Sequence, residues 1–517
     1  MATPLPAPSR YFESPIHLTG VLVLFTVLFW VFQRIYAALT SPLRKVPGPF
    51  WSHLTRYPLK WAVITGQRTL FIHKLHERYG PLVRISPWEV SCSDPEAVRA
   101  IHKPNSGFVK TDWYTALVET DEGIFSTSDP KKHASYRRLM ARAFSNSEIR
   151  THWEPMVHAK AKLAVHQIEN ECRRAGEADV LKWWTFMATD VSGTLMFGES
   201  FNMLEYGKKN EYIHVLELAM TAGGIRAELP LVDAIGKLLP IPACRTFFHA
   251  FKKLTSYGSK AVANSRRTKD DGTTNTTIFA QLDPDELAQT TCPLKTDADI
   301  FREAGGLIVA GSDTTAITLT YLTWCVLQRP QLHRALEAEV AALPAFTDAQ
   351  LETQCPLLTA SINEALRLYG AAPCSLPRRS VAPQGTTLAG FFVPPGTTVS
   401  TQAWTLHRDA AFWRDPETFT PARWLDLAPT TAPASLHFQP FNSGPRICLG
   451  LHLAMMELRV AFAVFLREFR GRVALGESMR GEKGEECMRV KDYFLIRPKG
   501  ERCMVAVGEE EQKREME

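Results

Sequence analysis

The amino-acid sequence predicts a mainly α-helical protein with small β-sheets, tethered to a membrane by one N-terminal transmembrane helix. An uncharged apolar run lies near the N-terminus, helical patterns prevail from about residue 55 onward, and only two segments look like short strands. A length of 517 residues would suggest about three domains, but no break in composition divides the body. We therefore expect one large domain behind the anchor.

The N-terminal run is long enough to cross a membrane. Residues 18–32 carry no charge, and residues 35–39 extend the run beyond Arg34, whose side chain can reach the interface. A spanning helix needs about 20 such residues. Basic residues follow the run, so the positive-inside rule places the body in the cytosol. A cleaved signal peptide is the alternative, but no small-x-small site closes the run.

Composition excludes several classes of protein. Hydrophobic residues make up 45% and charged residues 22%, which excludes disorder, collagen-like repeats and a multi-span transporter. The net charge of +5 comes without a dense basic stripe, so we expect no nucleic-acid partner. The ten cysteines include no C-x-x-C pair, which argues against a disulfide scaffold or a zinc site and favours a reduced, cytosol-facing protein.

The two strand-like segments have clear turn signals. Residues 82–91 are typical of two brief strands, and Asp94-Pro95 is typical of a helix start. Residues 386–393 and 397–403 flank Pro394-Pro395-Gly396, which predicts a hairpin that turns at these three residues.

One predicted helix differs from the others. It begins with the capping-box pattern of Thr296–Asp299 and continues to about residue 328. The helix is apolar nearly all round, which indicates burial, yet its middle carries glycines and the stretch Ser312–Thr315. A close helix crossing would explain the glycines. Asp313 and Thr314 instead indicate a ligand near the backbone, because a buried Asp is costly without a partner.

The segment FNSGPRICLG, residues 441–450, is the most informative. Cys448 follows a loop with Gly and Pro and precedes an amphipathic helix expected from Leu449 to about Phe469. The helix dipole and Arg446 would favour the thiolate, and loop N–H groups near the sulfur would tune it further. Cys448 is thus expected to be reactive or to bind a metal, with a plain core thiol as the alternative.

This segment resembles the haem-binding signature F-x-x-G-x-R-x-C-x-G of the cytochrome P-450 superfamily, the haem-thiolate monooxygenases. The matching residues are Phe441, Gly444, Arg446, Cys448 and Gly450. Three further segments resemble segments of the family and follow in the family's order. Ala310–Thr315 resembles its oxygen-activation groove, and Glu364–Arg367 resembles its E-x-x-R pair. Phe419–Trp424 resembles the stretch whose arginine joins that pair. The anchor and the Pro-rich hinge resemble the microsomal type, and the overall texture resembles filamentous-fungal members.

The resemblance implies a cytochrome P-450 fold and haem, with Cys448 as the ligand of its iron. Phe441, Arg446 and Gly450 would contact the haem from the cysteine loop. Glu364, Arg367 and Arg423 would form a structural network behind it.

Further haem contacts are implied on two other elements. Arg137 and His133 lie where the family usually has Trp-x-x-x-Arg, and a surface position is the alternative for Arg137. His133 in place of Trp keeps a hydrogen-bond donor whose strength would depend on pH. Arg378 is a third candidate, although its neighbour Arg379 leaves the register open.

The resemblance also implies how protons and electrons arrive. Thr314 would hold dioxygen and an adjacent water, and Asp313 would relay protons from solvent. Electrons would come from a separate membrane-bound NADPH-cytochrome reductase, since the chain shows no nucleotide-binding or flavin motif. The mildly basic balance would suit an acidic partner of this kind.

The implied activity is a monooxygenase that hydroxylates or otherwise oxidises a lipophilic small molecule with O2, as a tailoring step in fungal secondary metabolism on a terpenoid, polyketide or alkaloid. We expect substrate contacts in residues 108–125, 201–244 and 371–376. A haem-thiolate isomerase or dehydratase without net oxygen insertion is one alternative, and a non-catalytic haem-binding membrane protein is another. Asp313 and Thr314 argue against both.

The expected organisation follows. We assign residues 1–16 to a short lumenal N-terminus, 17–39 to a transmembrane anchor and 40–52 to a Pro-rich hinge. Residues 53–505 form the haem-thiolate catalytic domain in this assignment, and residues 506–517 form a charged tail. We expect a monomer that crosses the endoplasmic reticulum membrane once, with its catalytic domain in the cytosol.

Overall fold

Helices dominate the architecture, as the sequence predicts. The computed structural model describes residues 15–120, 122–253, 277–278, 294, 296–426 and 436–508, so most of the expected tail lies outside the described residues. The helices are α1 Pro15–Thr40, α2 Tyr57–Ile64, α3 Arg68–Tyr79, α4 Pro95–His102, α5 Asp112–Val118, α6 Pro130–Ala141, α7 Asn146–His152, α8 Glu154–Ala175, α9 Val180–Phe197, α10 Met203–Tyr206, α11 Glu211–Glu228, α12 Pro230–Leu238, α13 Pro242–Phe248, α16 Asp297–Leu327, α17 Pro330–Ala341, α18 Asp348–Gln354, α19 Pro356–Tyr369, α20 Ala403–Leu406, α21 Arg423–Asp426, α23 Leu451–Glu468 and α24 Gly481–Met488.

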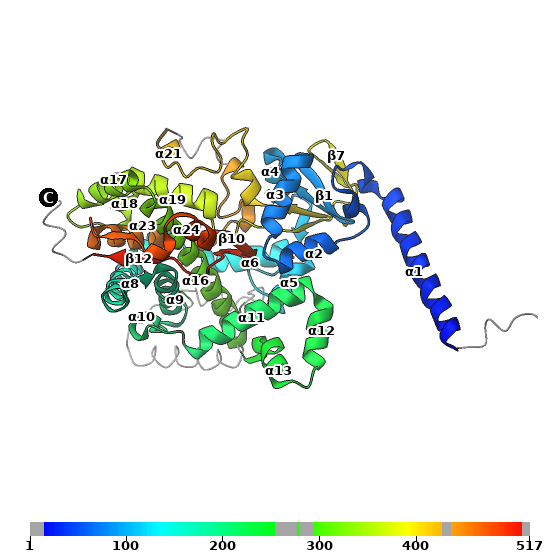
Figure 1. The fold of residues 1–517 in the computed structure, drawn as a ribbon, viewed down its shortest axis with the longest axis horizontal. Helices are drawn as coiled ribbons and strands as arrows, with labels where there is room; N and C mark the ends of the chain where they lie inside the picture. The colour runs from blue at the N-terminus through cyan, green and yellow to red at the C-terminus, as the bar shows by residue number, and fades with distance from the viewer. Residues whose placement is uncertain are drawn as a thin grey trace, which may run out of the picture.

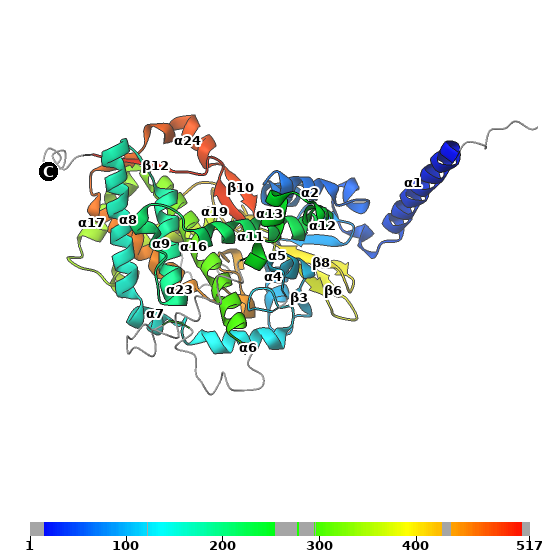
Figure 2. The same ribbon diagram turned by 90° about the horizontal axis from the view of Figure 1, so that it is seen from below.

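Helix α1 stands away from the body (Figures 1 and 2). Its stretch Leu18–Thr40 has 23 residues with a mean hydropathy of 1.9, and none of it is buried. A helix of a water-soluble body would bury such a surface, so the length, composition and exposure suit a single membrane anchor. The short 3₁₀ helix η1, Pro42–Lys45, follows and ends the span at a proline.

The largest sheet has five strands in the order β1-β2-β8-β5-β3. The strands of the fold are β1 Leu82–Ser86, β2 Glu89–Cys92, β3 Phe108–Lys110, β4 Ala178–Asp179, β5 Arg378–Ser380, β6 Thr386–Leu388, β7 Phe391–Val393, β8 Thr398–Thr401, β9 Val473–Leu475, β10 Val490–Tyr493, β11 Leu495–Pro498 and β12 Met504–Val507. The predicted pair of strands in residues 82–91 is confirmed as the antiparallel pair β1–β2. The predicted helix start is also confirmed, because the Asp94 side chain accepts a hydrogen bond from the Ala97 N–H.

The predicted hairpin around Pro394-Pro395-Gly396 is wrong. Strand β7 pairs with β6, and the chain turns between them at Ala389 and Gly390, whose φ angles are 45° and 81°. Strand β8 pairs with β2 and β5 instead. The Pro-Pro-Gly segment therefore connects two sheets. The hairpin turns before this segment, at Ala389 and Gly390 with their positive φ angles.

Two β elements were not expected. Strands β4, β12 and β9 form a three-stranded sheet, and β10 pairs with β11 as a hairpin. Their strands are only two to four residues long, so a period of two has little length in which to appear.

Helix α16 runs through the core as predicted, and its capping box at Thr296 and Asp299 is present. Its C-terminal half is buried, from Thr315 to Val326. A Cβ atom at Gly311 would lie 2.4 Å from Oγ of Ser192, so this glycine allows α16 and α9 to cross closely. Gly306, in contrast, has open space beside it. Packing thus explains one of the glycines, and an open cavity borders another.

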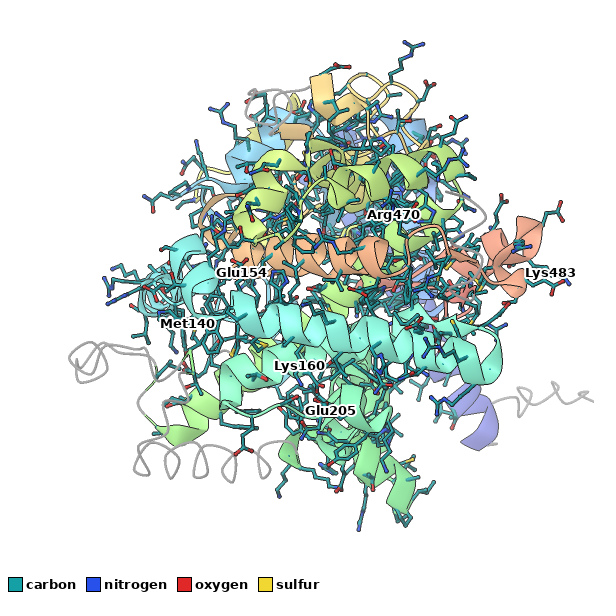
Figure 3. The ribbon with its side chains drawn as sticks, turned by 90° about the vertical axis from the view of Figure 1, so that its left-hand side faces the viewer. Met140, Glu154, Lys160, Glu205, Arg470 and Lys483 are labelled. Atoms are coloured by element: carbon teal, nitrogen blue, oxygen red, sulfur yellow. The ribbon has the colours of Figure 1, made fainter. Side chains whose placement is uncertain are left out.

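Helices α8 and α23 pack against each other on the face opposite the anchor (Figure 3). Lys160 of α8 forms an ion pair with Glu205 of α10 at 3.0 Å, and both are labelled in Figure 3. Helix α23 is the continuation of the cysteine loop, so this packing fixes the floor of the site against the helical core.

The Glu364 carboxylate is fully buried and connects distant parts of the chain. It accepts hydrogen bonds from Nε and Nη2 of Arg367 at 2.9 and 2.8 Å, and from Nε of Arg423 at 3.0 Å. The indole of Trp424 and the N–H of Thr420 also donate to it. Such a network holds α19 against the segment that leads to α21, as the resemblance implied for these residues.

A second chain of hydrogen bonds runs from this network to the cysteine loop. Nη1 of Arg367 donates to the His407 carbonyl, and Nδ1 of His407 bonds the Arg367 carbonyl at 2.8 Å. Nε2 of His407 accepts from the Gln439 N–H at 2.9 Å, and the Ser443 hydroxyl donates to the Gln439 side chain. The loop that carries Cys448 is thereby tied to α19.

We expect Glu364→Gln to lower the free energy of unfolding by about 3 kcal/mol, because it leaves buried arginines without their carboxylate. Glu96→Gln is the matched control, since Glu96 forms an exposed i,i+3 pair with Arg99 at 3.3 Å. That control should cost at most about 0.5 kcal/mol. Denaturant unfolding of the solubilised chain, followed by tryptophan fluorescence, measures both; equal effects of the two changes would contradict the assigned role of Glu364.

Candidate active site

A cavity of about 1260 Å³ lies between helix α16 and the cysteine loop. Its lining is mostly apolar, and it extends from the loop to α11 and to the β10–β11 hairpin. Parts of all three segments expected to contact the substrate line it, including Trp113, Leu216 and Ala371. The hairpin was not expected there; Phe494, Leu495 and Arg497 reach the cavity from it.

The cysteine loop depends on one glycine that no other residue could replace without movement. Gly444 has a φ of +67°, and a Cβ there would lie 1.9 Å from the His102 carbonyl oxygen. The Cys448 N–H then donates to the Phe441 carbonyl at 2.9 Å, which closes the loop below the cavity. Helix α23 begins at Leu451 with Gly450 as its N-cap, two residues later than predicted. Phe441, Arg446, Cys448 and Gly450 all line the cavity.

Cys448 is exposed to the cavity, and desolvation by the surrounding protein raises the pKa of its thiol. The Gly450 N–H and the Arg137 charge act in the opposite direction. The loop N–H group that lowers the thiol pKa is that of Gly450, and the charge that lowers it is that of Arg137 and not that of Arg446. A metal bound at this sulfur would displace the thiol proton.

Basic side chains gather at one edge of the cavity. Lys110, Arg137 and Arg446 line it from β3, α6 and the 3₁₀ helix η4, Gly444–Arg446. Nη1 of Arg446 is buried and has no hydrogen-bond partner. Lys110 is buried and forms no ion pair with any described carboxylate; its ammonium donates to the Phe125 carbonyl. Burial and the charges of Arg378 and Arg446 lower the pKa of Lys110 well below its usual value.

His133 belongs to the same edge but carries no charge near neutral pH. Burial lowers its pKa to about 3, and the charges of Arg446, Lys110, Arg137 and Arg378 act in the same direction. The expectation that the hydrogen bonding of His133 would vary with pH is therefore wrong near neutral pH. The imidazole remains a neutral donor.

The register of the doubled arginine is clear. Arg378 is buried, and its Nη1 donates to the Tyr114 hydroxyl at 2.8 Å. Arg379 is partly exposed and forms an ion pair with Asp112 at 3.1 Å. Arg378 thus points inward, but it lies behind the cavity wall and does not itself line the cavity. The Arg378 charge still lowers the pKa values of Lys110 and His133 at the basic edge of the cavity.

These features fit haem. A planar apolar group with two carboxylates at one edge needs an apolar slot, a ligand for its metal and uncompensated cations. The cavity offers the slot, Cys448 lies on its floor, and neither Lys110 nor Arg446 forms an ion pair with a carboxylate of the described residues. Sequence reasoning missed Lys110, although a lysine in a short strand followed by aromatic residues was visible at this position.

Asp313 and Thr314 face the cavity from α16. The Thr314 hydroxyl donates to the Ala310 carbonyl at 2.6 Å, which leaves its oxygen free to accept. The Asp313 carboxylate forms an ion pair with Arg497 at 2.7 Å. Burial alone would lower the pKa of Arg497, but Asp313, Glu217 and Glu501 outweigh it and raise the pKa. Arg497 is a further residue that sequence reasoning missed.

Two buried acids also border the cavity and were not expected. Burial raises the pKa of Glu303 on α16 to about 7, although the Ile124 N–H bonds its carboxylate. Burial raises the pKa of Glu457 on α23 to about 8, against the hydrogen bond from Thr315. Oε1 of Glu457 has no partner. For both Glu303 and Glu457, the only signal in the sequence was a single charged residue on an otherwise apolar helix face.

Three aromatic rings form one wall of the cavity. The Phe494 ring lies 5.6 Å from the Trp113 ring and 6.0 Å from the Phe125 ring. Phe494 has a φ of 89°, a conformation that L side chains rarely adopt, and its N–H donates to the Asp492 carboxylate. The hairpin thus places an aromatic ring on the wall at a cost in backbone strain.

A cavity with a cysteine on its floor and basic side chains at its edge, below an acid and an alcohol on a core helix, defines a haem-thiolate protein. The sequence model of the cytochrome P-450 family matches residues 45–491. The chain belongs to the cytochrome P-450 family, and it is a haem-thiolate monooxygenase with the fold of that family. Members typically use O2 and a partner reductase.

Fungal proteins are similar over most or nearly all of the chain. Cytochrome P-450 monooxygenase stcB of Emericella nidulans is 39% identical over 486 residues, which cover 92% of this chain and 91% of that protein. Cytochrome P-450 monooxygenase tazI of Aspergillus terreus is 41% identical over 490 residues, 94% of this chain and 98% of that protein. Methylphloroacetophenone oxidase of Cladonia uncialis is 34% identical over 406 residues, 74% and 86% of the two chains.

The raised pKa of Glu303 predicts a pH-dependent stability. A carboxyl whose pKa is raised from 4.5 to about 7 by folding stabilises the fold fully below pH ~4.5, and this contribution is lost as the pH rises through 7. The loss amounts to about 3 kcal/mol. Glu303→Gln removes the titrating group, so the difference in unfolding free energy between wild type and variant should change over this window. A difference that stays constant from pH 4.5 to 8 would contradict the assignment.

Proposed function

We propose that this monooxygenase hydroxylates or otherwise oxidises a lipophilic small molecule with O2 and NADPH-derived electrons, as a tailoring step in fungal secondary metabolism. The observation that carries this proposal is the position of Cys448 on the floor of an apolar cavity, with Asp313 and Thr314 on its other wall. When haem is bound, it supplies dioxygen activation and transfer of one oxygen atom to a carbon of the substrate.

The residues at the cavity floor and edge have distinct tasks in this proposal. Cys448 binds the iron through its sulfur, and the Gly450 N–H tunes that sulfur by a hydrogen bond. Lys110, Arg137 and Arg446 bind the carboxylates of the haem, and His133 donates a neutral hydrogen bond to them. Phe441 packs against the ring, while Arg378 acts on this edge through its charge and through Tyr114.

Asp313 and Thr314 handle protons in this proposal. Because the Thr314 hydroxyl donates to Ala310, its oxygen accepts a hydrogen bond from a water in the cavity and holds that water in place. Asp313 passes protons from solvent to this water. Arg497 positions the Asp313 carboxylate through their ion pair.

The lining supports a lipophilic substrate of moderate size. Val63, Ile64 and Leu229 reach the cavity from α2 and from the start of α12, where Leu231 and Ile235 are exposed. A molecule dissolved in the membrane can enter along such an apolar path. The wall of Trp113, Phe125 and Phe494 favours a ring system, and a relative named methylphloroacetophenone oxidase is consistent with this class.

The proposed setting follows from the anchor. A single copy spans the endoplasmic reticulum membrane once through α1, and the catalytic domain, residues 53–505, lies in the cytosol beside an NADPH-cytochrome reductase. A haem-thiolate enzyme without net oxygen insertion remains the second candidate, and the charged pair at Asp313 disfavours it, because such chemistry needs no proton relay from solvent.

The first test is spectroscopic. The reduced, carbon-monoxide-bound protein should show the strongly red-shifted Soret band of thiolate ligation, and Cys448→Ala should abolish it. Cys244→Ala is the matched control, since Cys244 lies on α13 and outside the cavity lining. Product formation coupled to NADPH and O2 consumption then separates a monooxygenase from an isomerase. Retention of the red-shifted band in Cys448→Ala would refute the ligand assignment.

Arg497→Gln should lower the amount of product formed per NADPH by about fivefold, as expected for the loss of a partly exposed ion pair that orients the acid. Arg497→Lys should recover part of it. The kinetic solvent isotope effect on product formation should rise in Arg497→Gln, which a merely structural role would not cause. Arg489→Gln, which breaks an exposed pair with Glu486 outside the cavity, is the control and should leave coupling unchanged. Unchanged coupling in Arg497→Gln would contradict the positioning role.

A further inference from the structure

The junction between the anchor and the body contains a second, much smaller cavity. It is lined by Arg34 of α1 and by Ser41, His53, Arg84 and Trp88 of the body, and it measures about 50 Å³. A cavity needs roughly 10–15 Å³ for one water, so this one accommodates a group larger than a single water. It is separate from the haem cavity, and neither the fold nor the proposed chemistry uses it.

Arg84 is the unusual residue of this junction. It is 1% exposed, and it forms no ion pair with any described carboxylate. Nη1 donates to Nδ1 of His53 at 2.8 Å, and Nη2 donates to the Ser41 hydroxyl at 3.1 Å and to the Pro87 carbonyl at 2.9 Å. All of these partners are neutral. Because burying a charge is costly without an opposite charge, the guanidinium indicates a position for an anion.

His53 is prepared to donate to the same position. Arginine can only donate, so Nδ1 of His53 must accept and its proton lies on Nε2. Burial and the charge of Arg84 lower the pKa of His53, which keeps the imidazole neutral. No described residue is hydrogen-bonded to Nε2, so the Nε2–H is available to a ligand. Arg34 is exposed, and its guanidinium lies 5.3 Å from the centre of the Trp30 ring.

The surrounding sequence has one sign of charge. Residues 14–76 contain seven Lys and Arg residues and no Asp or Glu. The apolar span ends at Thr40, so the cavity lies at the level where lipid headgroups meet the protein. Anionic lipids are enriched in the cytosolic leaflet and attract basic segments that directly follow a span. Charge and depth therefore select an anionic lipid.

We propose that this cavity binds the phosphate group of an anionic phospholipid in the leaflet where α1 leaves the membrane. The guanidinium groups of Arg34 and Arg84 supply charge and paired N–H donors, which match phosphate oxygens, and the Nε2–H of His53 completes the set. The bound lipid clamps α1 to the body through Arg34 and Arg84, so it sets how the body is oriented on the membrane. The proposal depends on the anchor but not on the chemistry at Cys448.

The test uses the full-length holoprotein in nanodiscs of phosphatidylcholine that contain a minority of phosphatidic acid. Native mass spectrometry counts the phosphatidic acid molecules that stay bound after the disc is stripped. Wild type should retain one, and the double variant Arg34→Gln, His53→Gln should retain about tenfold less, as expected for two lost bonds to a charged group. Arg56→Gln removes an exposed charge of the same stretch outside the cavity, and it should retain lipid as wild type does.

Three results would overturn the proposal. Equal retention of phosphatidylcholine and phosphatidic acid would show that no anion is selected. An equal loss in Arg56→Gln and in the double variant would show a diffuse attraction without a site. Displacement by millimolar inorganic phosphate, with no lipid retained, would assign the cavity to a free anion. The carbon-monoxide spectrum verifies folding of each variant, and Arg84→Lys, which keeps the charge but loses the paired donors, gives a second reading with an expected partial loss.

Discussion

The carboxylate of Glu364 is the interaction on which the site depends. The cysteine loop has little regular structure of its own, so its position is set by what it is tied to. Glu364 holds Arg367, Arg367 holds His407, and His407 holds Gln439, which bonds the Ser443 side chain at the start of the loop. A full negative charge in a dry core is tolerable only because five donors surround it. The floor of the haem cavity is therefore positioned by a charge network that never touches the ligand.

Helix α16 combines two demands that usually exclude each other. It must pack closely, as the contact between Gly311 and Ser192 shows, and it must leave its other side open to the cavity, as at Gly306. The acids near it differ for the same reason. Asp313 forms an ion pair with Arg497 at the cavity, whereas Glu303 and Glu457 have raised pKa values because burial outweighs their few partners.

Local signals in the sequence were sufficient for much of this architecture. The capping box at Thr296, the cap at Asp94 and the order of motifs around Cys448 all act over a few residues, and the structure contains each of them. Long-range pairs left no such signal; Arg497 meets Asp313 across 184 positions. The sequence also did not predict the neutrality of His133, because burial determines it and a linear pattern does not report depth. The hairpin error arose because Pro-Pro-Gly is as suitable for a connection between sheets as for a turn.

The stretch without acidic residues that includes the anchor accounts for the basic isoelectric point of the whole protein. The sequence has a pI of about 8.6, with 59 basic and 54 acidic residues. Seven of the basic residues lie in residues 14–76 with no acidic residue among them, so the remainder of the chain holds 52 basic against 54 acidic residues. The net charge of +5 is thus smaller than the seven positive charges of this one stretch, so the basic excess is concentrated in residues 14–76. Overall charge therefore gives no support to the idea that it recruits an acidic reductase; only the local charge of the docking face can do so.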